Sequence, residues 1–235
     1  MKNILRTFLL TAGLLIPLLS YSHVAIVDSV KCPVDGYHFE IEETVSYTVF
    51  GTLADFQKVG GTGYMYELYV HACPRCHYSG SRGDMDTVLP AIAKRDLLKL
   101  LIPYRRQKMT PLKELEIAIG MHKYFKRSDD DIANLYLVAS YLLKTDTQQT
   151  AKRKALQLAC ASYFIKALDN KAYSVPRDAE INYLVGDLYR RVGDFDKAIV
   201  YYDRADACPE KPEELQQWLI QQRKLAMNKD DDNSI

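Results

Sequence analysis

The pattern of hydrophobic and polar positions divides the 235-residue chain into three stretches of different character. Residues 7–19 are almost wholly apolar and carry no charge. Residues 32–83 contain short runs in which large apolar and polar side chains alternate, a period typical of β-strands. From residue 85 onward, apolar positions recur every three or four residues, which predicts helices. We therefore predict a leader, a small β-rich part and a larger helical part.

Three strands are predicted in the β-rich part. Residues 37–42 and 44–49 alternate most regularly, and residues 64–70 follow as a third strand after the glycine cluster at 60–63. Residues 23–31 are expected to form only a short apolar lead-in.

The periodicity of the helical part predicts seven helices, and capping residues mark the start of two of them. Thr110 is placed to cap a helix whose first residue is Pro111, and residues 128–131, Ser-Asp-Asp-Asp, form a strong helix start. The polar tail after residue 228 is expected to fray. The predicted helices span residues 89–105, 111–125, 132–143, 150–168, 176–192, 194–207 and 212–227.

The N-terminus has the three parts of a secretory signal in the required order. A short basic segment precedes the apolar run, and Ser20 and Ser22 supply small residues for a cleavage site after Ser22. The apolar run is shorter than the roughly 20 residues that span a bilayer. A periplasmic or secreted protein with no stable membrane span after cleavage is therefore expected, with a retained signal anchor as the alternative.

The charge of the mature chain is close to neutral. The signal holds two of the 31 basic residues and none of the 30 acidic ones, which leaves a formal charge of about −1. A near-neutral chain offers no electrostatic basis for binding nucleic acid or an anionic membrane surface.

Residues 185–205 contain an internal pattern of small and aromatic residues. Gly186 stands where two helices would come closest, and residues 193–194, Gly-Asp, make the turn between them. This run resembles a tetratricopeptide repeat, although Asn182 takes that family's tryptophan position. The positions that carry the likeness are Gly186, Tyr189, Ala198, Tyr202 and Ala205, with Cys160, Phe164, Ala167 and Ala139 in the preceding helix pair.

The resemblance implies a concave groove, lined by the first helix of each pair, that binds a protein or peptide partner. Arg190 and Arg191 are equally consistent with solvated surface charges, and a helical stack that binds nothing stays an alternative. By helical phase, the candidate groove residues are Tyr136, Ser140, Tyr183, Asp187, Arg190 and Arg191.

Two turns of the Cys-Pro type suggest a metal site. Residues 73–76 read Cys-Pro-Arg-Cys, the shape of a zinc knuckle, whereas residues 32–35 read Cys-Pro-Val-Asp, so Asp35 stands where a second cysteine would. Three thiolates and one carboxylate form an accepted zinc ligand set. The candidate ligands are Cys32, Asp35, Cys73 and Cys76, with His38, His71 and His77 as alternative fourth ligands.

These turns also carry a family resemblance. Cys32, Pro33 and Gly36, together with residues 64–78, resemble an uncharacterised bacterial family, domain of unknown function 2225. The resemblance implies a metal-type knuckle and a helical-repeat C-terminal half, and it implies no known activity. The chain departs from the family pattern at Asp35, where the family has cysteine, and at His77, where it has glycine.

Other chemistry remains open at the cysteines. In an oxidising compartment, Cys73 could form a disulfide with Cys76, or Cys32 with either of them. A redox-active thiol pair or a catalytic zinc held by these three residues are further alternatives. Cys160 and Cys208 fit as buried small apolar residues. The chain has no zincin motif, no Gly-x-Ser-x-Gly elbow and no phosphate loop.

Taken together, the sequence predicts an α+β chain that is mainly α. A small β-rich cysteine-knuckle module is followed by antiparallel helical hairpins of tetratricopeptide type. The function expected is that of an exported, non-enzymatic scaffold with a zinc-type or disulfide knuckle, and the alternative is a thiol-redox or zinc-dependent enzyme centred on the three cysteines. The expected boundaries are 1–22 for the signal, 23–84 for the knuckle module, 85–228 for the helical-repeat domain and 229–235 for the polar tail.

Overall fold

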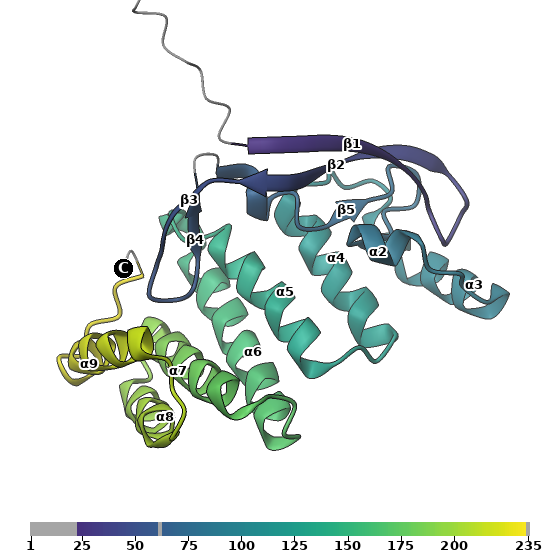
Figure 1. The fold of residues 1–235 in the computed structure, drawn as a ribbon. Coiled ribbons are helices and arrows are strands. Elements are labelled where there is room, and N and C mark those ends of the chain that lie inside the picture. Colours follow the sequence, from purple (N-terminus) through teal and green to yellow (C-terminus); the bar gives the residue numbers. More distant parts are fainter. Residues whose placement is uncertain (1–22, 61–62, 234–235) are drawn as a thin grey trace, which may run out of the picture.

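The computed structural model describes residues 23–60 and 63–233, and the predicted signal lies outside them. The described chain is mainly helical, with three small antiparallel strand pairs in its N-terminal third (Figure 1). Among the residues described, no helix combines the length and the apolar character needed to cross a membrane.

The longest strand pair is a ribbon of β1 (His23–Lys31) and β2 (His38–Tyr47), in which Lys31 pairs with His38 and His23 with Tyr47. Residues 23–31 are thus a full strand, which corrects the expected lead-in. The two strands expected at 37–42 and 44–49 are largely one continuous strand. Pairing across the tight turn extends both strands, and a bulge between Val24 and Ala25 absorbs the irregular alternation.

A second hairpin joins β3 (Val49–Thr52) to β4 (Lys58–Gly60). The strand predicted over 64–70 is absent from the described residues there, and a 3₁₀ turn, η2 (Gly63–Tyr66), begins that segment instead. Its last residue explains the difference. The Tyr66 hydroxyl accepts the backbone N–H of Lys58 at 2.7 Å, and its ring packs edge-on against Tyr141. Tertiary contacts therefore override the local alternation.

The third strand pair, β5 (His71–Ala72) and β6 (Ser79–Gly80), brackets the second cysteine turn. The helices follow, with caps where the sequence placed them: the hydroxyls of Thr110 and Ser128 accept backbone N–H groups of the first helical turn. They are α2 (Arg82–Met85), α3 (Ala91–Leu100), η3 (Ile102–Tyr104), α4 (Pro111–Tyr124), α5 (Asp129–Tyr141), η4 (Thr147–Gln149), α6 (Thr150–Asp169), α7 (Val175–Val192), α8 (Phe195–Ala207) and α9 (Glu213–Met227).

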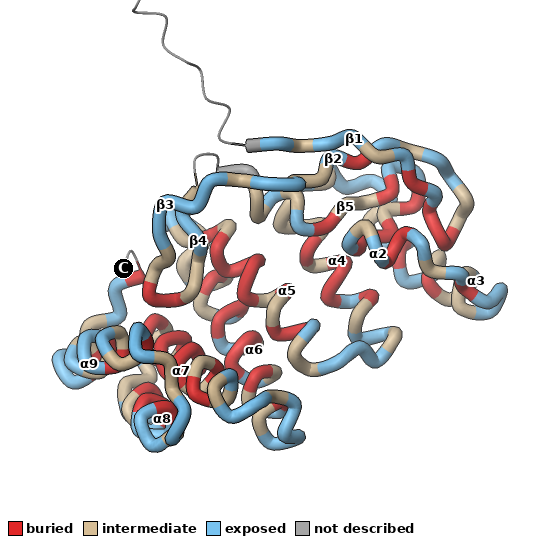
Figure 2. The backbone as a smooth tube through the Cα atoms, viewed as in Figure 1, coloured by how far each residue is buried: buried red, intermediate tan, exposed pale blue. Residues whose placement is uncertain are grey.

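Helices α4 to α9 pack against one another in chain order, so that each helix covers the one before it (Figure 1). Buried positions concentrate along the inner helices α5 to α7, whereas the free end of the β1–β2 ribbon is largely exposed (Figure 2). The predicted internal faces are buried as expected: Cys160, Phe164, Ala139 and Gly186 all lie inside the helical layer.

The C-terminal segment is docked where fraying was expected. Asn233 is buried, and its side-chain amide accepts a hydrogen bond from Gln157 at 2.8 Å. Lys154 binds Asp231 at 2.8 Å. The reason is electrostatic: residues 230–233 lie against cationic side chains of α6 and α7.

The contact at Gly186 gives a test of the helical packing. A Cβ atom at this position would lie 2.7 Å from Cδ1 of Tyr202 and 3.1 Å from the carbonyl oxygen of Ala198. We expect Gly186→Ala to lower the free energy of unfolding by about 1–3 kcal/mol, because overpacking forces the two helices apart. Chemical denaturation measures this.

Gly120→Ala is the matched control. Gly120 also lies within a helix, but a Cβ there would meet nothing within 4 Å. Alanine should therefore stabilise the chain by up to about 1 kcal/mol through helix propensity. Equal effects of the two substitutions would contradict the close approach of α7 and α8.

Candidate metal centre

Two turns with the same backbone hydrogen bonds bring the cysteines together. In the first, the N–H of Cys32 donates to the carbonyl oxygen of Tyr37 at 2.8 Å, and the N–H of Gly36 donates back to Cys32 at 3.0 Å. The second turn repeats both bonds: Cys73 N–H to Tyr78 at 2.8 Å, and His77 N–H to Cys73 at 2.8 Å. The two turns are therefore structural equivalents, in which Asp35 corresponds to Cys76.

The equivalence extends to a left-handed residue in each turn. Gly36 has φ of 72° and His77 has φ of 64°. Glycine adopts this region without steric cost, whereas a residue with a Cβ atom is strained there. His77 is thus a departure in residue type that leaves the shape of the turn intact.

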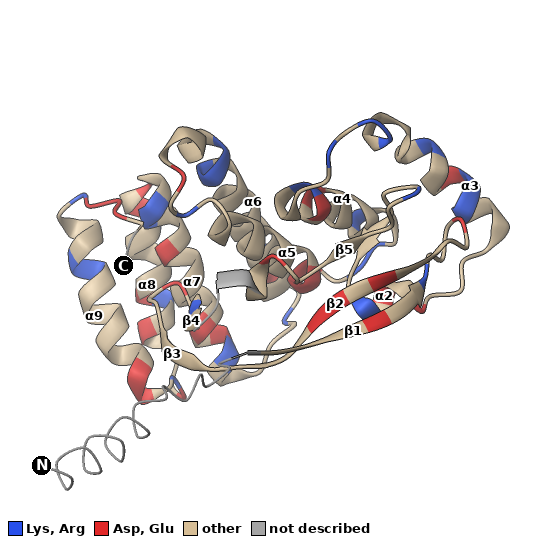
Figure 3. Cartoon of the chain, turned by 90° about the horizontal axis from the view of Figure 1, so that it is seen from above, with Lys and Arg blue, Asp and Glu red and all other residues tan. Residues whose placement is uncertain are grey.

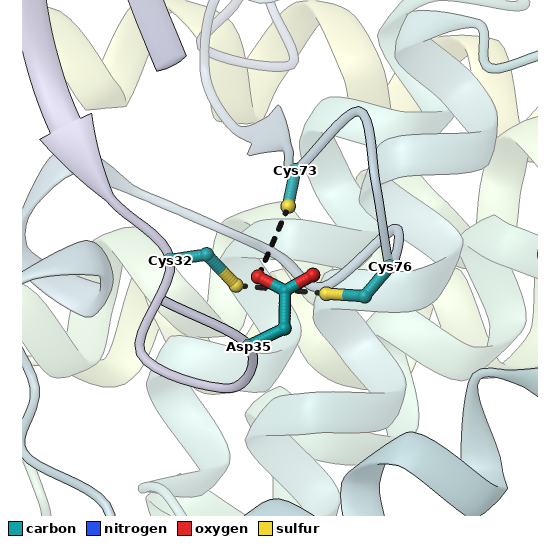
Figure 4. A group of neighbouring side chains, drawn as sticks. All are labelled: Cys32, Asp35, Cys73 and Cys76. Atoms are coloured by element: carbon teal, nitrogen blue, oxygen red, sulfur yellow. Dashed lines mark hydrogen bonds between the residues drawn. The ribbon is translucent and has the colours of Figure 1, made fainter. Parts of the chain in front are cut away.

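Four candidate ligand atoms converge between the turns (Figure 4). The sulfurs of Cys32, Cys73 and Cys76 and a carboxylate oxygen of Asp35 all lie within 4.8 Å of one another. The sulfurs of Cys32 and Cys76 are 3.5 Å apart, and Cys73 Sγ lies 3.8 Å from Asp35 Oδ1. All three cysteines are buried. The four residues predicted from the sequence are therefore the ones the fold brings together.

The spacing fits a tetrahedral ion better than a disulfide. Zinc–sulfur bonds of about 2.3 Å at tetrahedral angles separate two sulfurs by about 3.8 Å. A disulfide requires about 2.05 Å between sulfurs. The cysteines are free thiols, and the 3.5 Å between Cys32 and Cys76 lies near the tetrahedral value.

The three thiols have strongly different affinities for their protons. Hydrogen bonds from the thiols of Cys32 and Cys76 lower the pKa of Cys73, and backbone amides of Cys76 and Arg75 add to the effect. The hydrogen bond to Cys73 raises the pKa of Cys32, and hydrogen bonds to Cys32 and Cys73 together with burial raise the pKa of Cys76. These contacts favour loss of the Cys73 proton over those of Cys32 and Cys76, and the thiolate is the form of cysteine that binds a metal ion.

Asp35 is held in place by the turn itself. Its carboxylate accepts the backbone N–H of Tyr37 at 3.0 Å and lies 3.7 Å from Nε of Arg75. A cleft of about 490 Å³ opens beside the cluster and is lined by Asp35, Arg75, Cys76, Leu98 and Arg105.

The structure does not place a histidine among the candidate ligands. The only such group within the described ranges 23–60 and 63–233 contains the four residues above. His38 is exposed at the start of β2, while His71 and His77 are half-buried, and burial lowers the pKa of His71. His77 occupies the left-handed position of the second turn, while His38 follows the first turn and His71 precedes the second, and a role for any of them as the fourth ligand stays a prediction.

An ionic anchor beneath the second turn was missed by the sequence reasoning. The carboxylate of Asp84 accepts the backbone N–H and the hydroxyl of Ser81 at 2.9 and 2.8 Å, and it binds Arg127 at 3.2 Å and His122 at 3.5 Å. Burial raises the pKa of Asp84, but the hydrogen bonds from His122 and Ser81 lower it by more, so the net shift of this pKa is downward. The three-residue spacing of Ser81 and Asp84, typical of a capping box, was the available signal.

Two of the predicted groove residues, both on α5, make contacts within the helical layer. The hydroxyl of Ser140 is buried and donates to the carbonyl oxygen of Leu137 at 2.8 Å. Tyr136 is half-buried, and its hydroxyl accepts a hydrogen bond from Lys123 at 2.7 Å.

The four predicted groove residues on α7 are fully buried, which corrects the expectation of an open groove and of solvated arginines. The hydroxyl of Tyr183 donates to the carbonyl oxygen of Ala54 at 2.8 Å, and its ring packs against Phe56. Asp187 binds Arg190 and Arg191, whose guanidinium groups also reach carbonyl oxygens of residues 230–233. The β3–β4 loop and the C-terminal segment therefore cover this face, and its role in partner binding stays a prediction.

The described chain thus combines a candidate metal site of three cysteines and one aspartate with a layer of packed helices. A family described as an uncharacterised protein conserved in bacteria, domain of unknown function 2225, matches residues 26–226, and the chain belongs to that family. No curated protein and no solved structure matches the chain.

The raised pKa of Glu114 predicts how the free energy of unfolding depends on pH. Burial raises the pKa of this α4 carboxyl to about 7, partly offset by the backbone amide of Ala72, next to the second turn. A raised pKa in the folded state stabilises the fold below the unfolded-state value near 4.5, and this contribution is lost as pH rises through about 7. Glu114→Gln should therefore leave stability unchanged near pH 4.5 and increase it by about 2–3 kcal/mol at pH 8.

Urea denaturation of both proteins at the two pH values tests this. The difference between them is the relevant quantity, since thiol protonation changes both proteins alike. A stability gain that is the same at both pH values would contradict the titration of Glu114.

Proposed function

We propose that this chain is an exported, non-enzymatic scaffold, in which a zinc-type ion held by Cys32, Asp35, Cys73 and Cys76 stabilises the N-terminal module on a helical layer that binds a protein or peptide partner. The observation that carries the proposal is the convergence of three thiols and one carboxylate within 4.8 Å. Thiolate-rich tetrahedral sites are typical of structural zinc.

The location of the four ligands supports a structural role for the ion. The two turns are 38 residues apart between Asp35 and Cys73, and the cysteines belong to one apolar cluster with Val30, Ile41 and residues of α3 and α4. An ion here would cross-link the β1–β2 ribbon to the segment that leads into the helices. A metal ion that cross-links segments so far apart contributes directly to folding free energy.

The scaffold part of the proposal is supported by the helical half. Close packing at Gly186 and the buried small–aromatic face of α6 and α8 agree with the tetratricopeptide resemblance. Proteins of that type present helical surfaces to extended peptides. Export rests on the order of charged, apolar and small residues in the leader.

One observation favours a second candidate, a thiol-redox or zinc-dependent enzyme. The cleft that reaches Asp35 and Cys76 is lined by two arginines, and α3, which contributes Leu98 to the cleft, carries three basic residues and Asp96 (Figure 3). A carboxylate ligand that exchanges with water would give such a cleft access to the ion.

Metal content after purification from the periplasm tests the proposal. We expect about one zinc ion per chain, and Cys73→Ser should reduce it to near zero and lower the melting temperature, because one of the four ligands is lost. Asp35→Cys, which completes a four-thiolate site, should retain the ion and slow its removal by a chelator. Elemental analysis and calorimetry measure both effects.

Cys208→Ser is the matched control, because Cys208 directly follows α8 and lies outside the ligand group. It should change neither zinc content nor melting temperature. A metal-free protein with a disulfide among the three cysteines would contradict the zinc site. A zinc-free protein with a rapidly alkylated Cys73 would favour the enzyme.

A further inference from the structure

The C-terminal segment 230–233 lies in a site built mainly from fully buried arginines. Arg190 donates to the carbonyl oxygens of Asp230 and Asp232 at 3.0 and 2.9 Å, and Arg191 donates to that of Asn233 at 2.6 Å. These bonds go to the backbone of the segment, so the site recognises an extended chain rather than one particular side chain. Such contacts are available to any peptide that adopts the same path.

Two side chains of α6 add recognition of side-chain chemistry. Lys154 binds the carboxylate of Asp231 at 2.8 Å, and Gln157 donates to the side-chain oxygen of Asn233 at 2.8 Å. The arginines of α7 are already paired with Asp187 and Asp55, so the positive charge that faces the three consecutive aspartates of the segment comes from Lys154. Charge complementarity therefore favours an acidic occupant.

The internal segment does not satisfy every hydrogen-bonding group of the site. The side-chain oxygen of Gln157 is buried and has no hydrogen-bond partner among the described residues. An unsatisfied acceptor at this depth carries a cost that a ligand N–H would remove. A different peptide could thus make more hydrogen bonds here than the chain's own segment does.

A cleft of about 690 Å³ continues from the same site and is not filled by the described chain. Leu158, Val192 and Phe195 contribute apolar surface, and Lys154 and Lys229 stand at its edge. Asp194 and Asp196 also line the cleft, and the carboxylate of Asp194 is bound by Lys197 at 2.6 Å. Lys154 reaches both the cleft and Asp231, because its ammonium group also lies 3.4 Å from the carbonyl oxygen of Val192.

We propose that the surface formed by Lys154, Gln157, Arg190 and Arg191, with the adjoining cleft, binds an extended acidic peptide segment of a partner protein, with an apolar residue beside its acidic run. Residues 230–233 are an internal competitor for the acidic half of this site. The proposal rests on the scaffold function and names the chemistry of its partner.

The internal competitor is suited to displacement. It is held by polar contacts, and of its four residues Asn233 alone is buried. Segments with few buried apolar contacts belong to the least stable parts of a fold. An external peptide therefore competes with a segment that is held by hydrogen bonds rather than by apolar burial and is present at high local concentration, which lowers the apparent affinity of the peptide for the intact chain.

A chain ending at Lys229 tests the proposal. The probe is a fluorescein-labelled peptide with the sequence of residues 226–235, and binding is followed by fluorescence anisotropy on folded protein whose zinc content matches that of the full chain. We expect binding at least tenfold tighter to the shortened chain than to the full chain. A peptide with asparagine at all three aspartate positions should bind at least fivefold more weakly.

Two lysines of α6 provide a matched pair of variants. Lys154→Gln in the shortened chain should weaken binding of the acidic peptide and leave binding of the asparagine peptide unchanged. Lys152→Gln is the control, because Lys152 pairs with Glu116 at 2.7 Å, away from the site. Loss of affinity in both variants would indicate a general charge effect and would overturn the proposal.

Further outcomes separate this proposal from the scaffold function. Equal binding of both peptides would leave a peptide-binding scaffold and overturn its preference for acidic segments. Absence of binding to a folded, zinc-loaded shortened chain would overturn the acidic site, while the metal measurement decides the knuckle. A full chain that sediments as a dimer and is dissociated by the peptide would show exchange of the segment between two copies, and would also overturn it.

If the shortened chain does not fold, Asn233→Ala in the full chain replaces it. This variant removes the hydrogen bond from Gln157 and weakens the internal segment without removing it. We then expect the variant to bind the peptide more tightly than the full chain does, by less than the tenfold gain expected of the shortened chain. An affinity equal to that of the full chain would overturn the proposal.

Discussion

The buried ionic cluster around Asp187 is the interaction on which the arrangement of the two halves depends. Asp187 binds Arg190 and Arg191, and Arg191 also faces Asp55, which Lys144 binds at 2.7 Å. Charges removed from water are costly unless each has partners, and breaking one member of such a cluster costs roughly 3–5 kcal/mol. The β3–β4 loop supplies Asp55 as a partner for the buried Arg191, and α7 in turn supplies Arg191 as a partner for the buried Asp55. Each of the two elements therefore stabilises the other.

The knuckle solves a different problem at the other end of the molecule. A two-stranded ribbon is at best marginally stable by itself in water, and the large apolar side chains near the free end of the β1–β2 ribbon stay exposed. The cysteine turns join the ribbon to the segment that enters α3 and α4. The ion pair between Asp84 and Arg127 holds the same segment against the end of α4. Three buried cysteines, the hydrogen-bonded carboxylate of Asp84 and an apolar cluster thus lie together where the chain passes from strand to helix.

Much of this organisation was predictable from local sequence. Helical periodicity and the caps at Thr110 and Ser128 located the helices, and the small residue at Gly186 located the closest helix contact. The four candidate ligands were predictable because a Cys-Pro turn fixes which positions point inward.

The sequence could not show what depends on contacts between distant segments. Residues 64–70 alternate like a strand, but Tyr66 is held by Lys58 and Tyr141. Consecutive arginines at 190 and 191 are typical of a surface, and only their pairing with Asp187 and with a segment 40 residues further on makes burial possible.

The packing of Phe56 against both Tyr183 and Trp218, whose rings also stack on each other, has a consequence for how the protein unfolds. A loop from the N-terminal third is therefore part of the aromatic core of the last helices, and the β-rich and helical stretches on either side of residue 84 share this packing. Unfolding should proceed as one cooperative transition. Substitutions that destabilise the cysteine turns should then also lower the stability of α7 to α9. After proteolysis near residue 84, neither of the two fragments should stay folded.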